Sequence, residues 1–80
     1  MGVETIQTTA HQALVALLIA ERMRAGLRQE DVAERLNQHQ SWIARVESGQ
    51  RRVDVVEFLA LAKAIGFDPA AAIKRLGKVR

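Results

Sequence analysis

The apolar positions along most of this chain follow the spacing of α-helices, and no stretch shows the strict alternation typical of a β-strand. In the middle of the chain, two short helical patterns are separated by three polar residues, 37–39. Val32 and Leu36 give the first pattern an apolar side, and Ile43 and Val46 do the same for the second. Because the connection is too short to let the helices separate, the pattern predicts a helix-turn-helix.

Three further helical patterns flank this pair. The first begins at Thr9, which we expect to cap it, and ends before Gly26. The fourth begins after Asp54 and the fifth after Asp68, and Asp is a favoured residue at the N-cap of a helix. We therefore expect an all-α fold, a compact domain of five helices in which the second and third form the helix-turn-helix.

The same patterns set the expected domain boundaries. Residues 1–8 carry no periodicity and are expected to form a flexible N-terminal arm. Residues 9–77 form the helix-turn-helix domain, and residues 78–80 form a basic C-terminal tail. No internal repeat or low-complexity linker interrupts the domain.

Two of the expected helices have more apolar residues than one buried stripe requires. In the first helix, Val15, Leu17 and Ile19 extend the apolar surface beyond one face. Either this helix has an unusually apolar core face, or its second face contacts a partner chain. The fourth helix is apolar nearly all round, which predicts that it is buried on most sides.

The small size of the chain also favours self-association. A chain of 80 residues buries only about 60% of its unfolded surface, so its core is marginal. The absence of cysteine excludes disulfides and thiolate zinc sites as added support. We therefore expect a homodimer whose interface includes Phe58, Ile73 and Leu76, with the N-terminal helix as the alternative contact.

The sequence offers little for catalysis. Neither His11 nor His39 has a nucleophile or paired carboxylate at a suitable spacing, and no phosphate loop or zinc motif is present. We expect both histidines to be solvated or capping residues, and the protein to be a non-enzyme without cofactor or metal.

Charge and hydropathy indicate a polyanionic partner and argue against a membrane. The formal net charge is +3, which suits nucleic acid but does not by itself establish it. The longest apolar run, residues 13–20, is far shorter than the roughly 18 residues that a membrane span needs. The N-terminus lacks the basic region of a signal peptide, so we expect a cytoplasmic protein.

The third helix carries side chains suited to reading DNA. With Ile43 and Val46 facing inward, Gln40, Ser41 and Arg45 face outward. Gln can bond bidentately to adenine, Arg to guanine, and Ser to several base edges in the major groove. These three residues are therefore the predicted base contacts, and the alternative is a solvated polar helix face.

The chain resembles the XRE or phage-repressor type of helix-turn-helix protein over residues 18–67. Residues 26–36 and 40–51 match the motif Gly-Leu-x-Gln-Glu-x-[Leu/Val]-Ala-Glu-Arg-Leu, a turn, and Gln-Ser-x-Ile-x-Arg-[Ile/Val]-Glu-x-Gly-x-Arg. Three positions depart from it: Arg28 replaces a Thr or Ser cap, Asn37 replaces a Gly, and Ala44 replaces a frequent Ser. The resemblance implies a lambda-repressor-like domain that binds double-stranded DNA.

Further site residues follow from this resemblance and from the position of the turns. Arg22 and Glu47 match a structural ion pair between the first and third helices. Trp42 either lies against the sugar-phosphate backbone or packs on the flank of the third helix. The expected DNA phosphate contacts are Arg28, Gln29, His39, Trp42, Gln50, Arg51 and Arg52.

Together these features predict a sequence-specific DNA-binding transcriptional regulator, a repressor that acts as a homodimer. One alternative is the antitoxin of a toxin–antitoxin pair, which would add a toxin protein as a partner. Another is a protein-interaction module that kept the fold without DNA binding. The polar outer face of the third helix argues against this last alternative.

Overall fold

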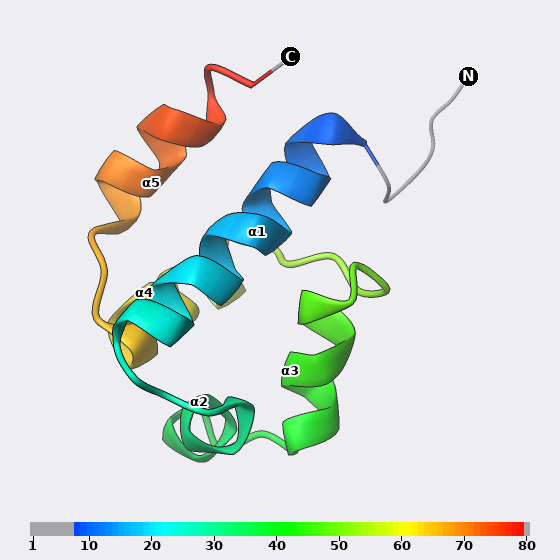
Figure 1. Cartoon of the computed structure of the whole chain (residues 1–80), viewed down its shortest axis with the longest axis vertical. Coiled ribbons are helices and arrows are strands. Elements are labelled where there is room, and N and C mark those ends of the chain that lie inside the picture. Colours follow the sequence, from blue (N-terminus) through cyan, green and yellow to red (C-terminus); the bar gives the residue numbers. More distant parts are fainter. Residues whose placement is uncertain (1–7, 80) are drawn as a thin grey trace.

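The computed structural model describes residues 8–79, which form five α-helices and no strand (Figure 1). The helices are α1 (Thr9–Arg24), α2 (Gln29–Arg35), α3 (Gln40–Glu47), α4 (Val55–Ile65) and α5 (Pro69–Leu76). In Figure 1, α3 and α5 lie on opposite sides of α1. The expected all-α, five-helix fold is confirmed. Most of the expected N-terminal arm, and the last residue of the basic tail, lie outside the described residues.

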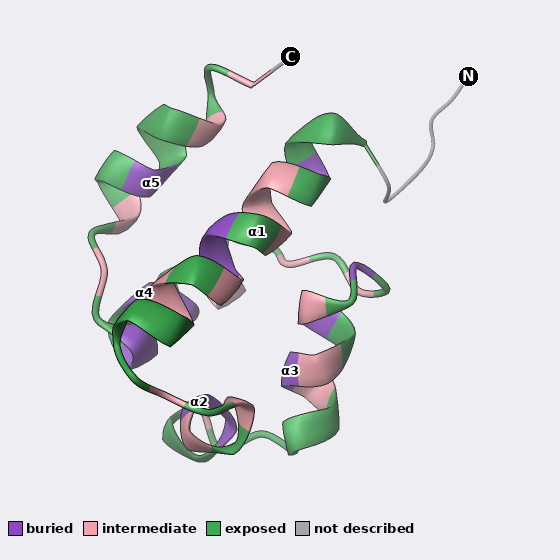
Figure 2. Cartoon of the chain, viewed as in Figure 1, coloured by how far each residue is buried: buried purple, intermediate pink, exposed green. Residues whose placement is uncertain are grey.

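All five helices contribute to one apolar core, and each of them carries buried positions, coloured purple in Figure 2. Its buried members are Leu17, Leu18, Val32, Ala33, Ile43, Val46, Phe58, Leu61, Ala64, Ile65 and Ala72. The small Ala33 lies on α2, the helix that packs most closely on α3. This core fixes the position of α3 against α1 and α2.

The helix termini are mostly capped as expected. Asp54 accepts a hydrogen bond from the Glu57 backbone N–H at 2.7 Å, and Glu57 accepts one from the Asp54 N–H at 3.0 Å. Asp68 caps α5 by accepting from the Ala70 N–H at 3.0 Å. The cap of α1 is a correction: Thr8, one residue earlier than expected, accepts from the His11 N–H at 3.1 Å.

The turn between α2 and α3 depends on one residue with unusual backbone geometry. Asn37 follows the end of α2 with φ +55°, a left-handed conformation that Asn tolerates better than most residues. At the start of α2, Arg28 has no side-chain oxygen with which to cap the helix. Asp31 compensates in part, because its carboxylate accepts from the Arg28 backbone N–H at 2.8 Å.

Three expectations about burial are wrong. Helix α4 is not buried on most sides, because Val55 and Val56 are 68% and 75% exposed. Phe58 is only 4% exposed and packs against Phe67 in the core, so its ring offers little surface for the expected dimer contact. His11 is 6% exposed rather than solvated, and its Nε2 has no hydrogen-bond partner among the described residues.

Candidate nucleic-acid interface

Helix α3 presents one buried side and one exposed polar side. Ile43 and Val46 are buried against the core, which holds the helix in a fixed rotation. Gln40, Ser41 and Arg45 are all exposed, as the sequence predicted for the base contacts. The structure therefore brings these three residues together on the outer surface of α3.

The expected ion pair between α1 and the end of α3 is present. Arg22 donates from Nε to Glu47 Oε2 at 2.6 Å and from Nη2 to Glu47 Oε1 at 2.9 Å. A third donation runs from Arg22 Nη1 to the Leu27 carbonyl at 2.9 Å. The Arg22 and Glu47 side chains are 15% and 9% exposed, and the hydrogen bond to Glu47 raises the pKa of Arg22.

A chain of hydrogen bonds continues from this ion pair to the first residue of α3. Gln29, the first residue of α2, donates from Nε2 to Glu47 Oε1 at 2.9 Å. Gln40 in turn donates from Nε2 to Gln29 Oε1 at 2.6 Å. Sequence reasoning assigned Gln29 to phosphate and Gln40 to a base, and it missed their mutual contact. The only signal was a glutamine at the N-terminus of both helices.

Arg51 is held within the protein rather than directed at a partner. Its guanidinium donates to Glu57 at 3.0 and 2.8 Å and to the Arg52 carbonyl at 2.8 Å, and it lies 4.9 Å from the Trp42 ring centroid. Hydrogen bonds from Arg51 and from the Asp54 N–H hold the pKa of Glu57 below its usual value. Arg51 is thus better placed to fasten the loop to α4 than to bind phosphate.

Trp42 packs on the flank of α3, which is the second of the two arrangements expected for it. The ring is half-buried and packs against the core, and its face is covered by Arg51. A ring in this position stabilises the flank of α3 and leaves little surface for a sugar-phosphate edge.

The other expected phosphate contacts lie at the surface around α2 and α3. Gln50 and Arg52 are exposed in the loop that follows α3. His39 is the exposed N-cap residue of α3 and makes no side-chain capping bond. Arg28 donates to Asp31 at 3.1 Å in a surface ion pair, which is weak enough to rearrange around a ligand.

Arg35 makes a scaffold contact that sequence analysis did not identify. Its Nη1 donates to the Ala64 carbonyl near the end of α4 at 2.7 Å. The bond ties α2 to α4 and satisfies a carbonyl that the last turn of a helix leaves without an intrahelical partner. A basic residue in the last turn of α2 was the only available signal.

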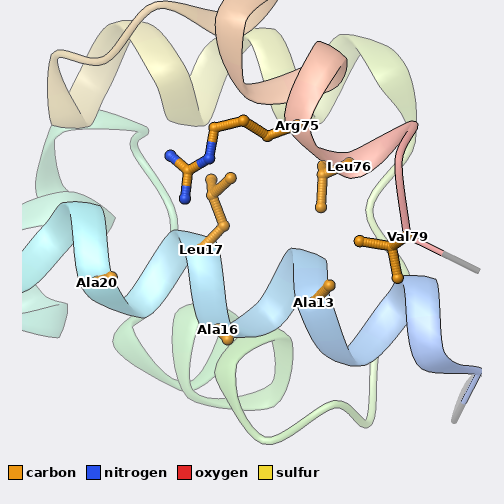
Figure 3. A pocket seen from close by; sticks show the side chains of 7 residues that line it. All are labelled: Ala13, Ala16, Leu17, Ala20, Arg75, Leu76 and Val79. Carbon is orange, nitrogen blue, oxygen red and sulfur yellow. The ribbon is translucent and has the colours of Figure 1, made fainter.

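A hollow in the described part of the chain lies away from α3, between α1 and α5. It measures about 380 Å³, and small residues of α1 form its floor (Figure 3). Arg75 reaches from α5 over Leu17 on one side, and Val79 closes the other. No group of three metal-binding side chains exists within residues 8–79, and no helix there is long and apolar enough to cross a membrane.

A family model described as a helix-turn-helix domain matches residues 13–73. An XRE-family like protein from Pseudomonas syringae pv. tomato is 40% identical, with 85% of this chain and 83% of that chain covered and a TM-score of 0.82. The restriction-modification controller protein C.AhdI from Aeromonas hydrophila is 33% identical, with 75% and 91% covered and a TM-score of 0.68.

The controller protein C.Esp1396I, crystallised as a tetramer with its operator, shares the fold at 18% identity. That match covers 90% of this chain and 95% of that chain, with a TM-score of 0.79. No curated protein sequence matches the chain significantly.

Proposed function

The chain belongs to the XRE-type helix-turn-helix family, and from this premise we propose that it is a DNA-binding transcriptional regulator, a repressor that binds its operator as a homodimer. The observation that carries the proposal is the exposed face of α3. Gln40, Ser41 and Arg45 project from a helix whose opposite side is fixed in the core. The 33% identical relative is itself a restriction-modification controller protein.

Base reading is assigned to the outer face of α3 in the major groove. Arg45 makes no ion pair with the described residues, so its guanidinium can bond to guanine O6 and N7 without losing a partner. Gln40 can bond to adenine N6 and N7 from the N-terminal end of the helix, and Ser41 beside it can reach either edge.

Phosphate binding is assigned to the residues on either side of this face. Gln50 and Arg52 lie in the loop after α3, and Arg28 and Gln29 lie at the start of α2. His39 lies directly before α3. Such contacts set the orientation of the protein on the duplex and make its affinity depend on salt. Arg51 and Trp42 are left out because Trp42 packs against the core and Arg51 is engaged by Glu57 and by the Trp42 ring.

Dimerisation is assigned to the exposed apolar surface at α4 and α5. The exposed apolar side chains there, each about half exposed or more, are Val55, Val56 and Leu59 of α4 and Ile73 of α5. Ile73 and the half-buried Leu76 also line an apolar groove of about 120 Å³ beside Val55. A second copy placed there would bury this surface. Two copies would present two α3 helices to half-sites about 34 Å apart.

The proposal is tested by measuring the affinity of the full chain for genomic DNA fragments over a series of salt concentrations. A DNA-binding regulator should bind some fragments much more tightly than others, and its affinity should fall steeply as salt rises. A matched control is the Gln40→Ala, Arg45→Ala double variant, which should keep salt-dependent binding and lose the preference. Absence of binding at low salt would instead indicate an interaction module.

A further inference from the structure

We infer that Glu47 is a positioning residue that determines which purine base Gln40 prefers, and that it acts through Gln29. This inference rests on the proposed function, because it requires Gln40 to contact a base. It extends that function by giving the α1–α3 ion pair a role in specificity in addition to its role in stability.

The geometry places Glu47 between a cation and an amide. The Glu47 side chain is 9% exposed, and its Oε1 accepts from Arg22 Nη2 and from Gln29 Nε2, each at 2.9 Å. The other face of the Gln29 amide meets Gln40, whose Nε2 donates to Gln29 Oε1 at 2.6 Å. Gln40 is thus connected to the buried ion pair by two consecutive hydrogen bonds.

The chemistry of Glu47 gives this chain of hydrogen bonds a direction. An ionised carboxylate accepts hydrogen bonds and cannot donate them, and the Arg22 guanidinium donates to both Glu47 oxygens. Gln29 must therefore turn its NH₂ group toward Glu47, which leaves its oxygen facing Gln40. Gln40 must in turn use one N–H to reach that oxygen. The orientation of both amides follows from the single negative charge at Glu47.

The direction of these hydrogen bonds determines which donor and acceptor groups Gln40 presents to DNA. With one N–H engaged by Gln29, Gln40 keeps one acceptor, Oε1, and one donor, its second N–H. Adenine presents the complementary pair in the major groove, a donor at N6 and an acceptor at N7. Guanine presents two acceptors, O6 and N7, and so leaves Gln40 Oε1 facing another acceptor. The hydrogen-bond chain should therefore select adenine over guanine.

Reversing the chain should reverse the selection. If Gln29 turned its NH₂ group toward Gln40, the Gln40 oxygen would be engaged and both of its N–H groups would face the base. Two donors match the two acceptors of guanine. Glu47→Gln permits this reversal, because the new amide has the same shape as the carboxylate but is able to donate.

The experiment compares the affinities of operator duplexes that differ by A or G at the position that Gln40 reads. The operator comes from sites selected out of random DNA, and Gln40→Ala identifies the position. We expect the wild type to prefer A by about tenfold or more, and Glu47→Gln to reduce this ratio below about threefold. Gln29→Met breaks the chain without touching the ion pair, and should also lower the ratio.

A control separates positioning from loss of stability. Arg35→Met removes the scaffold bond to the Ala64 carbonyl and leaves the hydrogen-bond chain intact, so its A:G ratio should stay at the wild-type value. The inference is overturned if Glu47→Gln and Gln29→Met keep the wild-type ratio, or if Arg35→Met lowers it equally. If Glu47→Gln does not fold, Gln29→Met decides. If Gln40→Ala changes the base preference at no position of the operator, the base contact assigned to Gln40 in the proposed function is wrong instead.

Discussion

The Arg22 guanidinium and the Glu47 carboxylate form two hydrogen bonds across 25 residues of sequence, at 2.6 and 2.9 Å. Both side chains are largely buried, so neither charge can return to water when the other is removed. The pair joins the last turn of α1 to the last residue of α3. Removing one partner should therefore lower the free energy of unfolding by more than removing one partner of a surface ion pair does.

We predict that Arg22→Ala lowers the free energy of unfolding by about 3 kcal/mol, because Glu47 is left buried without its cation. In a domain of this size the melting temperature should fall by more than about 10 °C, as followed by circular dichroism. The matched control is Arg24→Ala. Arg24 is 67% exposed and pairs with Glu21 at the surface, so its loss should cost less than about 1 kcal/mol. Equal melting temperatures for the two variants would show that the buried pair contributes no more to stability than the surface pair does.

Arg45→Ala should weaken binding to the cognate site by about 1–3 kcal/mol and relax preference at one base pair, while non-specific binding stays nearly unchanged. The reason is that Arg45 lies on the exposed face of α3 and has no ion-pair partner among the described residues. Binding isotherms on cognate and scrambled duplexes give both quantities. A loss of affinity that is equal on all sequences would make Arg45 a phosphate contact instead.

Arg51 and Arg52 are adjacent in sequence but should behave differently toward salt. Arg52 is exposed in the loop after α3, so Arg52→Ala should reduce the slope of log affinity against log salt by about one unit, as expected for the loss of one phosphate contact. Arg51→Ala should leave this slope unchanged, because its guanidinium is engaged by Glu57 and Trp42. If Arg51→Ala reduces the slope as much as Arg52→Ala does, then Arg51 contacts phosphate despite its internal partners.

The Arg51–Glu57 pair should also make stability depend on pH. The pKa of Glu57 is lowered in the folded state, chiefly by the hydrogen bonds from Arg51. The stability that it contributes is therefore present above about pH 4.3, the usual pKa of Glu, and is lost as the pH falls through the lowered folded value. Urea unfolding should show Arg51→Ala less stable than the wild type at pH 7. The difference should narrow by pH 3, and a constant difference would exclude a role for Glu57 ionisation.

We predict that the wild type sediments as a dimer at micromolar concentration and that Ile73→Asp shifts it to monomer, with loss of cooperative operator binding. A charge at Ile73 would have to be buried in the proposed α4–α5 interface. Ala71→Asp adds the same charge to an exposed residue on the opposite side of α5 and should remain dimeric. A wild-type monomer would end the dimer proposal. A dimer that tolerates Ile73→Asp would move the interface to α1.

The sequence was sufficient to predict the helices and the core of the helix-turn-helix. Spacing alone placed Ile43 and Val46 inside and Gln40 and Arg45 outside, because a helix of fixed pitch assigns each residue a direction. The family resemblance supplied the Arg22–Glu47 pair, which no local pattern reveals. The capping box of α4 was visible because its two residues are three apart in the sequence.

The contacts that could not be predicted depend on how separate elements pack. The apolar residues of α4 gave no indication of which side faces the core, so the helix was expected to be buried on most sides and Phe58 was assigned to an interface. Arg51 was treated as a free cation because the fold brings Glu57 to it across a turn. The bond between Gln29 and Gln40 likewise requires the angle between α2 and α3, which periodicity does not provide.

The most direct test of the central claim, that α3 reads DNA as part of a two-fold dimer, is selection of bound sites from random double-stranded DNA. We predict enrichment of a two-fold symmetric site whose half-sites are centred about 34 Å, or one helical turn, apart. Replacing Gln40 by alanine should remove the preference at one base pair of each half-site, and replacing Arg45 by alanine should remove it at a different base pair. A pool that remains random after repeated selection, although the protein is folded and binds DNA at low salt, would contradict the claim.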